Sequence, residues 1–388
     1  MIFVINAGSS SVKFAVFDRA QPPSVIESGQ ASVRDGEVTV SGTLSNGDSF
    51  SLPGWSLDTE HDRVSLLLEA VAETLSKQFQ NAPDAVVHRV VHGGSTFREP
   101  VRVTEPVRDA LESLVDLAPL HQPVNLAGID VFAELYPDTP QIACFDTAFH
   151  FGQSPLETHF ALPEHLFEQG VRKYGFHGLS YAYIASELPR YGVSDTDRVI
   201  VCHLGNGASL CAIQAGQSVA STMGFTALDG LPMGTRAGRL DAGVVLHLID
   251  QLGWTVEEVE HLLYHDSGLK GLSGISSDVR TLEASTDPRA AFALAYFSYR
   301  IQAEIGALVA ILGGLDVLVF TAGIGEHSMQ IRSRVCEGLS RWWPVELDAS
   351  ANEAQSETLH TDRSRVRVLR LPTDENLWMA MSASAHCL

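Results

Sequence analysis

The chain has 388 residues, of which 45% are hydrophobic and 19% charged. This composition is typical of a globular protein with room for two or three hydrophobic cores. Its 26 basic and 47 acidic residues give a formal net charge of −21. That charge argues against nucleic acid or an anionic membrane as a partner, since both require a basic face.

Five cysteines show no CxxC pair and no spacing typical of metal ligands. The odd number of cysteines and the lack of a signal peptide favour a reducing cytoplasm. The longest apolar stretch, residues 305–315, is too short to span a bilayer and contains paired glycines. The sequence therefore predicts a cytoplasmic protein without a membrane segment.

Residues 5–18 read INAGSSSVKFAVFD, which predicts a strand, a turn of one glycine and three serines, and a returning strand. No helix follows this turn, unlike the phosphate loops of P-loop or dinucleotide-binding proteins. Residues 2–18 and 199–215 align without a gap when Gly8 is placed on Gly205. Two such hairpins half a chain apart predict two related domains.

The remaining elements alternate between helices and strands. The patterns predict helices over 62–79, 255–264 and 287–312, strands over 85–91, 141–146, 316–321 and 366–371, an irregular domain border over 155–163, and a C-terminal helix capped by Thr373 or Asp374. This alternation predicts an α/β protein.

Three small-residue turns, AGSSS, LGNGAS and AGIGE, each follow an apolar strand. Glycine allows the backbone N–H groups to approach an anion, and strand ends are where ligands collect in α/β sheets. The third turn opens a predicted helix, whose dipole would add to the effect. Three such turns in one chain favour a nucleotide polyphosphate over turns with no ligand.

Arg89 in HRVVHGG and Arg236 in LPMGTRAG interrupt apolar or small residues with no acidic residue nearby in sequence. A guanidinium in that setting favours a carboxylate or phosphate ligand, whereas most other arginines are expected to be solvated. His121, His177 and His203 lie at strand or loop edges and suit either a functional or a structural role. No HxxxH or HExxH spacing indicates zinc.

Two carboxylates lie at element ends. Asp146 ends a predicted strand in CFDTAFH, and Glu375 lies in PTDEN at the start of the C-terminal helix. Each could face Mg²⁺ or a reacting group, and each could equally be a helix-start residue.

Taken together, the segments resemble the acetate kinase family, within the group of sugar kinases, actin and Hsp70-type ATPases. They occur over nearly the whole chain and in the family order: INAGSSSVKF, HRVVHGG, PLHQPVN, FDTAFH, YGFHG, HLGNGAS, MGTRAG, GISSDVR, FTAGIGEH and TDEN. The resemblance implies duplicated RNase-H-like domains with a central cleft. The N-terminal domain would be 1–148, completed by the C-terminal helix at about 376–388, and the nucleotide-binding domain 149–375.

The resemblance implies reversible transfer of a phosphoryl group from ATP to acetate, giving acetyl phosphate, a precursor of acetyl-CoA, and ADP, with Mg²⁺ or Mn²⁺ as cofactor. Arg89 would hold the substrate carboxylate, Asp146 would be the catalytic acid or an orienting group, and His177 and Arg236 would stabilise the transition state. The residues with a binding role would be Asn6 and Glu375 for the metal; Lys13, His203, Leu204, Gly205, Asn206, Gly207, Asp278, Val279, Arg280, Gly323, Ile324, Gly325, Glu326 and His327 for the nucleotide; and Val91, Leu120, His121, Phe176 and Ala227, with Arg89, for the substrate.

The chain departs from the family pattern at four places, and the first two changes touch neither His177 nor Arg236. Tyr181 replaces the second histidine of GFHGTSH, and MGTRAGRLDA replaces MGTRSGDIDP. His327 stands where the family often has asparagine. Ala227 stands where the family typically has a proline of the methyl pocket, so the loss of bulk predicts use of propionate beside acetate.

Three alternatives remain open at this point: a propionate or butyrate kinase, a partner-clamping Hsp70-like ATPase, and a degenerate nucleotide-binding subunit. A length of 388 residues leaves no room for an appended partner-binding domain, which counts against the second. The resemblance further implies a homodimer.

Overall fold

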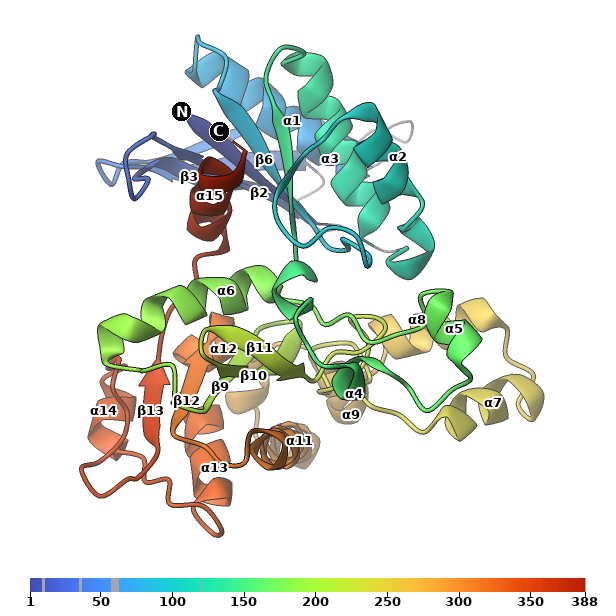
Figure 1. The fold of residues 1–388 in the computed structure, drawn as a ribbon, viewed down its shortest axis with the longest axis vertical. Coiled ribbons are helices and arrows are strands. Elements are labelled where there is room, and N and C mark those ends of the chain that lie inside the picture. The colour runs from blue at the N-terminus through green and yellow to red at the C-terminus, as the bar shows by residue number, and fades with distance from the viewer. Residues whose placement is uncertain (9–10, 35–36, 57–62, 120, 388) are drawn as a thin grey trace. The chain divides into compact units, whose positions relative to one another are not determined.

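A computed structural model describes residues 1–8, 11–34, 37–56, 63–119 and 121–387. It divides into two compact units, of which unit 1 comprises 1–148 and 374–388 and unit 2 comprises 149–373. Each unit contains one sheet with helices packed against it (Figure 1). The predicted α/β class is confirmed.

Unit 1 is built on an eight-stranded sheet in the order β5-β4-β3-β2-β1-β6-β8-β7. Strands β1 to β5 form an antiparallel meander, whereas β6 is parallel to both β1 and β8. Its elements are β1 Ile2–Ala7, β2 Ser11–Phe17, β3 Val25–Arg34, β4 Glu37–Leu44, β5 Ser49–Ser56, α1 Arg63–Gln78, β6 Ala85–Val90, β7 Val101–Arg102, α2 Glu105–Glu112, a 3-10 turn Val115–Leu117, α3 Gln122–Leu135, β8 Gln141–Phe145 and α15 Glu375–His386, with a 3-10 turn Ala148–His150 at its border.

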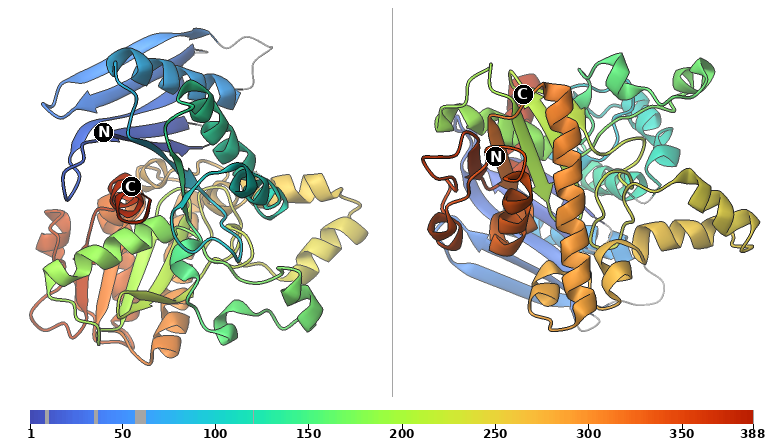
Figure 2. Two further views of the ribbon diagram at one scale, coloured as in Figure 1. Left: turned by 45° about the horizontal axis from the view of Figure 1, so that its top comes forward. Right: turned by 90° about the horizontal axis from the view of Figure 1, so that it is seen from below.

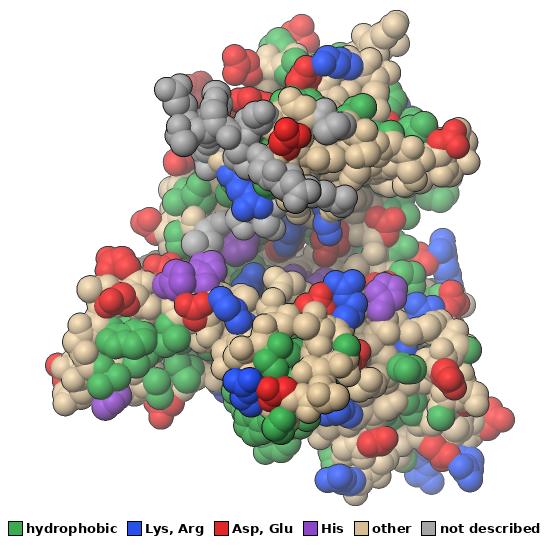
Figure 3. Space-filling model, turned by 180° about the vertical axis from the view of Figure 1, so that it is seen from behind, with side chains coloured by type: hydrophobic (Ala, Val, Ile, Leu, Met, Phe, Trp, Pro, Cys, Tyr) green, Lys and Arg blue, Asp and Glu red, His purple; other side chains and the backbone are tan. Residues whose placement is uncertain are grey.

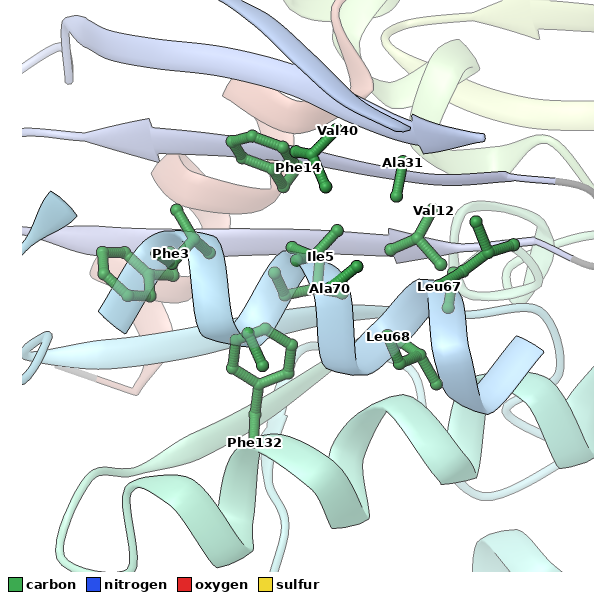
Figure 4. Close-up of a cluster of buried hydrophobic side chains, with 14 of the residues drawn as sticks. Phe3, Ile5, Val12, Phe14, Ala31, Val40, Leu67, Leu68, Ala70 and Phe132 are labelled. Atoms are coloured by element: carbon green, nitrogen blue, oxygen red, sulfur yellow. The ribbon is translucent and has the colours of Figure 1, made fainter. Parts of the chain in front are cut away.

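The core of unit 1 follows from the alternation of side chains along the strands. Phe3 and Ile5 of β1 and Phe14 of β2 lie in one cluster with Leu67 of α1 and Phe132 of α3, all buried (Figure 4). Helix α15 packs on β1, β2, β6 and β8 from the opposite face. Both faces of the central strands are therefore covered, which explains why these strands read as continuous apolar runs.

Unit 2 has a five-stranded sheet in the order β11-β10-β9-β12-β13. Helix α6 packs on one face of this sheet, and the long helix α11 packs against β10 and β11 (Figure 2). Its elements are α4 Pro155–Thr158, α5 Glu164–Glu168, α6 Gly178–Glu187, a 3-10 turn Leu188–Tyr191, β9 Val199–Leu204, β10 Ala208–Gln214, β11 Gln217–Ser221, α7 Ala242–Asp250, α8 Val256–His265, α9 Gly268–Ser273, α10 Val279–Glu283, α11 Pro288–Leu312, β12 Val317–Thr321, α12 Ala322–His327, α13 Met329–Leu339, α14 Ala349–Glu353 and β13 Arg367–Arg370.

The two sheets share one topology. When the strands of each set are numbered 1 to 5 along the chain, their order across the sheet is 3-2-1-4-5 both for β3-β2-β1-β6-β8 and for β11-β10-β9-β12-β13. In both sets, an antiparallel hairpin is followed by parallel strands. The predicted duplication of a hairpin-based domain is thus confirmed. The structure corrects one detail of the gapless match: Ala7 pairs with Val12, but Leu204 pairs with Ala208, so the second turn is one residue shorter.

Capping residues set the helix ends much as predicted. The Asp287 side chain caps α11 by accepting from the Arg289 N–H, and Gly313 ends this helix in the left-handed conformation. Asp374, not Thr373, caps the C-terminal helix. The stretch 155–163, predicted as irregular, contains the short helix α4, because Pro155 occupies the first helical position.

Within the described residues, no helix is both long and apolar enough to cross a membrane. Cys144, Cys202, Cys211 and Cys336 are buried free thiols, and Cys387 is a partly buried one. Burial of Cys202 and Cys211 in strands was predicted from their apolar surroundings and is confirmed.

Candidate active site

The first group of candidate residues lies at one edge of the unit 1 sheet. Asn6 is on β1, Arg89 is on β6, and Asp146 follows β8, and these three strands are parallel neighbours. The carboxyl ends of parallel strands meet at one sheet edge, which explains why residues so far apart in sequence come together.

Arg89 binds Asp146 through two hydrogen bonds. Its Nε donates to Asp146 Oδ1 over 3.0 Å and its Nη2 donates to Oδ2 over 2.5 Å, while Nη1 donates to Asn6 Oδ1 over 3.2 Å. Burial alone would lower the pKa of Arg89, but the carboxylates of Asp146 and Glu375 raise it above its usual value. Arg89 therefore stays charged, and its forked pairing fixes the direction of the guanidinium.

Arg89 does have an acidic partner, although the sequence around it contains none. That partner, Asp146, lies 57 positions further along the chain. Because Asp146 is only 2% exposed and both of its oxygens accept from Arg89, it is placed to orient the guanidinium. This arrangement favours the orienting role over that of a proton donor.

Oxygen ligands accompany this pair. Glu375 is the first residue of α15, following the cap Asp374, whose Oδ1 accepts from the Leu377 N–H over 2.9 Å. Lys13 lies directly across the hairpin from Asn6, with an exposed side chain. Amide and carboxylate oxygens are the donors that Mg²⁺ prefers. Asn6 and Glu375 each carry one such oxygen group, and among the described residues no three His, Cys, Asp or Glu side chains gather as a metal site.

Asn125 of α3 holds the ends of two strands in unit 1. Its Oδ1 accepts from the Val91 N–H over 2.9 Å, and its Nδ2 donates to the Ala7 carbonyl over 3.0 Å. Asn125 lies in the segment PLHQPVN and was not predicted as a site residue, because a buried amide between two strand ends can be recognised only in three dimensions. His121 is the N-cap residue of α3, and Leu120 lies outside the described residues.

The second group lies in unit 2, around the N-terminus of α6. His177 precedes this helix in the left-handed conformation, with φ of 59°. Its ring stacks on that of His203 of β9, with centroids 4.2 Å apart. His177 Nδ1 lies 2.8 Å from Ser209 Oγ, and His203 Nδ1 lies 2.8 Å from Ser180 Oγ. Both rings are therefore held at one nitrogen.

Arg236 lies close to the same point. A Cβ added at Gly207 would lie 3.2 Å from His177 Nε2 and 3.8 Å from Arg236 Nη1, so these two side chains converge on the glycine turn. Arg236 Nη1 also donates to the Ala227 carbonyl over 2.9 Å. Glycine at 207 keeps this space free of a side chain. Phe176 is buried beside His177, and its carbonyl accepts from the His150 ring.

A cavity of about 520 Å³ begins at the same turn. This volume is in the range of nucleotide-sized ligands. It is lined by Gly205, Asn206, Ser277, Asp278, Val279, Arg280, Glu283, Gly323, Ile324, His327 and Ser328. Eight of these residues were predicted from the sequence to bind the nucleotide, and the structure brings them together around one cavity. Ser277, Glu283 and Ser328 were missed; the first was quoted in GISSDVR, and the other two had no sequence signal.

The remaining nucleotide candidates do not line this cavity. Leu204 is buried in β9, and Gly325 is buried in α12. The Glu326 side chain accepts from the Thr373 N–H over 3.4 Å. Arg280 and Asp278, which do line the cavity, pair with each other, and this hydrogen bond is the main reason why the pKa of Asp278 is lowered. The carbonyls of Gly325 and Glu326 accept hydrogen bonds from Arg332, a fully buried arginine that was not predicted from the sequence to have a role.

Comparisons with known proteins identify the family of the chain. Residues 1–381 match the acetokinase family. Acetate kinase from Rhodopseudomonas palustris is 49% identical over 98% of this chain and 96% of its own length, and that from Methylocella silvestris is 47% identical over 96% and 95%. Among solved structures, acetate kinase from Porphyromonas gingivalis is 34% identical with a TM-score of 0.86, covering 98% of this chain and 97% of its own. A propionate kinase from Francisella tularensis is 32% identical with a TM-score of 0.89, covering 98% of both. Matches of this length and identity show that the chain belongs to the acetokinase family.

Proposed function

We propose that the protein catalyses reversible, metal-dependent phosphoryl transfer from ATP to acetate, giving acetyl phosphate and ADP. One observation carries the proposal: in unit 2, a nucleotide-sized cavity begins at Gly205 and Asn206, and the same turn continues to Gly207, where His177 and Arg236 converge. A cavity for a nucleoside next to two groups able to bind phosphoryl oxygens is what a kinase requires. The relatives named acetate kinase indicate the acceptor.

The groups of unit 1 suit the acceptor. A carboxylate is already ionised at pH 7, so no strong base is needed to make it a nucleophile. The difficulty is to bring one anion to another, and the Arg89 guanidinium, fixed by Asp146, can neutralise the attacking carboxylate. We assign Asp146 the task of orienting Arg89.

The groups of unit 2 suit the moving phosphoryl group. His177 and Arg236 would bind its equatorial oxygens, His203 and the 204–207 turn would bind the phosphate chain, and Val279 and Ile324 would line the nucleoside end. Removing one such donor typically costs roughly 2.7–4 kcal/mol of transition-state stabilisation. Asn6 and Glu375 would hold Mg²⁺ or Mn²⁺, which when bound neutralises phosphate charge.

This assignment makes unit 1 the acceptor-binding domain, completed by the C-terminal helix, and unit 2 the nucleotide-binding domain. The free thiols of the described cysteines support work in a reducing compartment such as the cytoplasm.

Propionate is a second substrate that a specific feature favours. Ala227 is partly exposed and its carbonyl accepts from Arg236, to which we assign the moving phosphoryl group. Alanine in place of proline removes about two methylenes of bulk, and one methylene is worth roughly 1–3 kcal/mol in such a pocket. The structural similarity to a propionate kinase is consistent with this wider range.

A second copy of this chain is the partner that we propose. Helix α7 has no buried residue, and Figure 3 shows a hydrophobic patch over it. The exposed apolar side chains are Leu240, Val244, Leu246, Ile249 and Leu252, with Val256 at the start of α8. A contiguous apolar face marks an interaction surface. Two chains of net charge −21 repel, so an uncharged interface suits a homodimer.

The test is acyl phosphate formation from ATP and Mg²⁺ across acetate, propionate and butyrate, measured by hydroxylamine trapping. We expect turnover that depends wholly on the carboxylate and is largest with acetate. Arg89→Ala should lose at least a hundredfold in kcat/KM. Arg108→Ala is the matched control, because Arg108 also binds a carboxylate, that of Asp130, with two hydrogen bonds but on the surface of unit 1. ATP hydrolysis without any carboxylate, or full activity of Arg89→Ala, contradicts the proposal.

A further inference from the structure

A buried tyrosine lies behind the His177–Ser209 pair. Tyr181 belongs to α6, is fully buried, and its hydroxyl lies 2.5 Å from Ser209 Oγ. Ser209 is also fully buried, and its Oγ lies 2.8 Å from His177 Nδ1. The three groups therefore form a chain from the core to the histidine that faces Gly207.

The direction of the hydrogen bonds in this chain follows from counting hydrogens. In the described part of the protein, Ser209 is the only hydrogen-bond partner of the Tyr181 hydroxyl. Apart from Tyr181, the only side chain there that shares a hydrogen bond with Ser209 Oγ is His177. If Tyr181 donates to Ser209 and Ser209 donates to His177 Nδ1, every hydrogen has an acceptor. If Nδ1 carried a hydrogen, either the tyrosine or the serine hydrogen would be buried without an acceptor, which is costly.

We propose that Tyr181, acting through Ser209, holds the His177 proton at Nε2, so that Tyr181 and Ser209 are positioning residues for phosphoryl transfer. Nε2 is the nitrogen that lies 3.2 Å from the Cβ position of Gly207. A proton held there makes His177 a hydrogen-bond donor toward an anion in this turn, while Nδ1 is already engaged. This inference rests on the proposed function for its catalytic meaning, but the proton position is a property of the free protein.

The neighbouring histidine provides an internal comparison. His203 Nδ1 also binds a serine, Ser180, but no tyrosine hydroxyl follows that serine in the described residues. The Tyr181 ring makes edge contacts with His150 and His203, with centroids 5.7 and 6.2 Å away. Tyr181→Phe keeps these ring contacts and removes only the hydroxyl, so it isolates the proposed donor.

Two-bond ¹⁵N–¹H NMR of the histidine rings tests the proton position directly. The His177 signal is identified by its absence in His177→Gln. We expect the Nε2–H form in the wild-type protein at pH 7.5, and a mixture of both neutral forms in Tyr181→Phe with the His203 signal unchanged. An Nδ1–H or doubly protonated His177 in the wild-type protein at that pH would overturn the inference, because the proton position is read from the wild-type spectrum and His177→Gln serves only to identify the signal.

Kinetics separates positioning from a merely structural role. We expect kcat of Tyr181→Phe to fall about five- to tenfold, with both KM values within about twofold, because one buried hydrogen bond is lost. Ser209→Ala should show the same pattern. Tyr299→Phe, on the exposed face of α11, should change nothing. An Nε2–H signal in a protein that does not phosphorylate acetate would refute the proposed function and leave the proton assignment standing; an unchanged kcat in Tyr181→Phe would refute the positioning role.

Discussion

Replacement of Arg332 by methionine should weaken nucleotide binding and destabilise unit 2. Arg332 of α13 is fully buried, and its guanidinium connects two short helices. Nη1 donates to the Gly325 and Glu326 carbonyls of α12 over 2.9 and 2.7 Å, and Nε donates to Asn352 Oδ1 of α14 over 2.7 Å. Because α12 also carries Gly323 and Ile324 of the nucleotide cavity, Arg332 fixes one wall of that cavity.

The expected magnitude follows from these contacts. Methionine fills most of the volume but donates nothing. Five acceptors therefore lose a hydrogen bond at roughly 1–1.5 kcal/mol each, because Nη2 also donates to the Asn352 carbonyl and to Gln355 Oε1. Burial lowers the pKa of Arg332 to about 10, so the group is charged at neutral pH and its removal returns part of the desolvation energy. We expect a net loss of about 3 kcal/mol, which corresponds to a fall in Tm of roughly 6–12 °C for a domain of this size. The KM for ATP should rise about tenfold, which is about 1.4 kcal/mol, while the KM for acetate stays unchanged.

Thermal unfolding with and without ADP, together with KM for each substrate, measures both effects. Arg332→Lys should be intermediate, because an ammonium group cannot reach both helices with a fixed fork. Arg341→Met is the matched control, since Arg341 is exposed just beyond the same helix. An unchanged Tm together with equal rises of both KM values would show that Arg332 does not support the cavity wall.

Three further predictions concern other parts of the chain. Burial raises the pKa of Glu27 to about 7, so between about pH 4.5 and 7 the folded state holds a proton that the unfolded state has lost. The free energy of unfolding should therefore fall by up to about 3 kcal/mol as the pH rises through this window. Glu27→Gln should abolish that fall in urea titrations at pH 5 and 8. Ala227→Pro should lower the ratio of kcat/KM for propionate to that for acetate by about tenfold or more in the hydroxamate assay. Leu246→Asp should reduce the mass in light scattering from about twice 41.9 kDa to 41.9 kDa, because a charge on an apolar interface is costly.

Each of these three has a matched control. Glu37→Gln, at the exposed first residue of β4, should leave the pH dependence of stability unchanged. Ala227→Val restores bulk without fixing the backbone and should shift the substrate ratio in the same direction as proline. Leu156→Asp alters a leucine that is 95% exposed and lies outside the patch, so the dimer should persist. A flat wild-type pH profile, an unchanged substrate ratio, or a dimeric Leu246→Asp protein would each contradict the corresponding reasoning.

The sequence was sufficient for features that depend on local chemistry. Helix α11 begins after Asp287-Pro288 and ends at Gly313, as expected, because capping residues act on their own neighbourhood. The two hairpins were recognisable because strand and turn residues alternate over short spans. The shorter second turn was not, since a one-residue difference in register does not alter the apolar pattern of strands buried on both faces.

Side-chain partners from distant segments could not be predicted from the sequence. The pairing of Arg89 with Asp146 depends on the order of strands β6 and β8 in the sheet. Arg332 reads as an ordinary charged position in a helix, and only the packing of α12 and α14 around it shows that its charge is buried. Residues that act by binding backbone carbonyls leave no mark on their partners in the sequence, because every residue has a carbonyl.

The duplicated hairpin shows how one geometry came to hold two different sets of groups. With Gly8 on Gly205, Asn6 occupies the place of His203, and the structure pairs Asn6 with Lys13 and His203 with Ser209. Directly opposed residues of an antiparallel pair point to the same face, so both units present two polar side chains beside the small-residue turn. In unit 1 these are an amide and a lysine, which suit a metal ion and phosphate. In unit 2 they are a histidine and the serine that binds His177, so the proton of His177 depends on a residue that a hairpin of this kind places beside its turn.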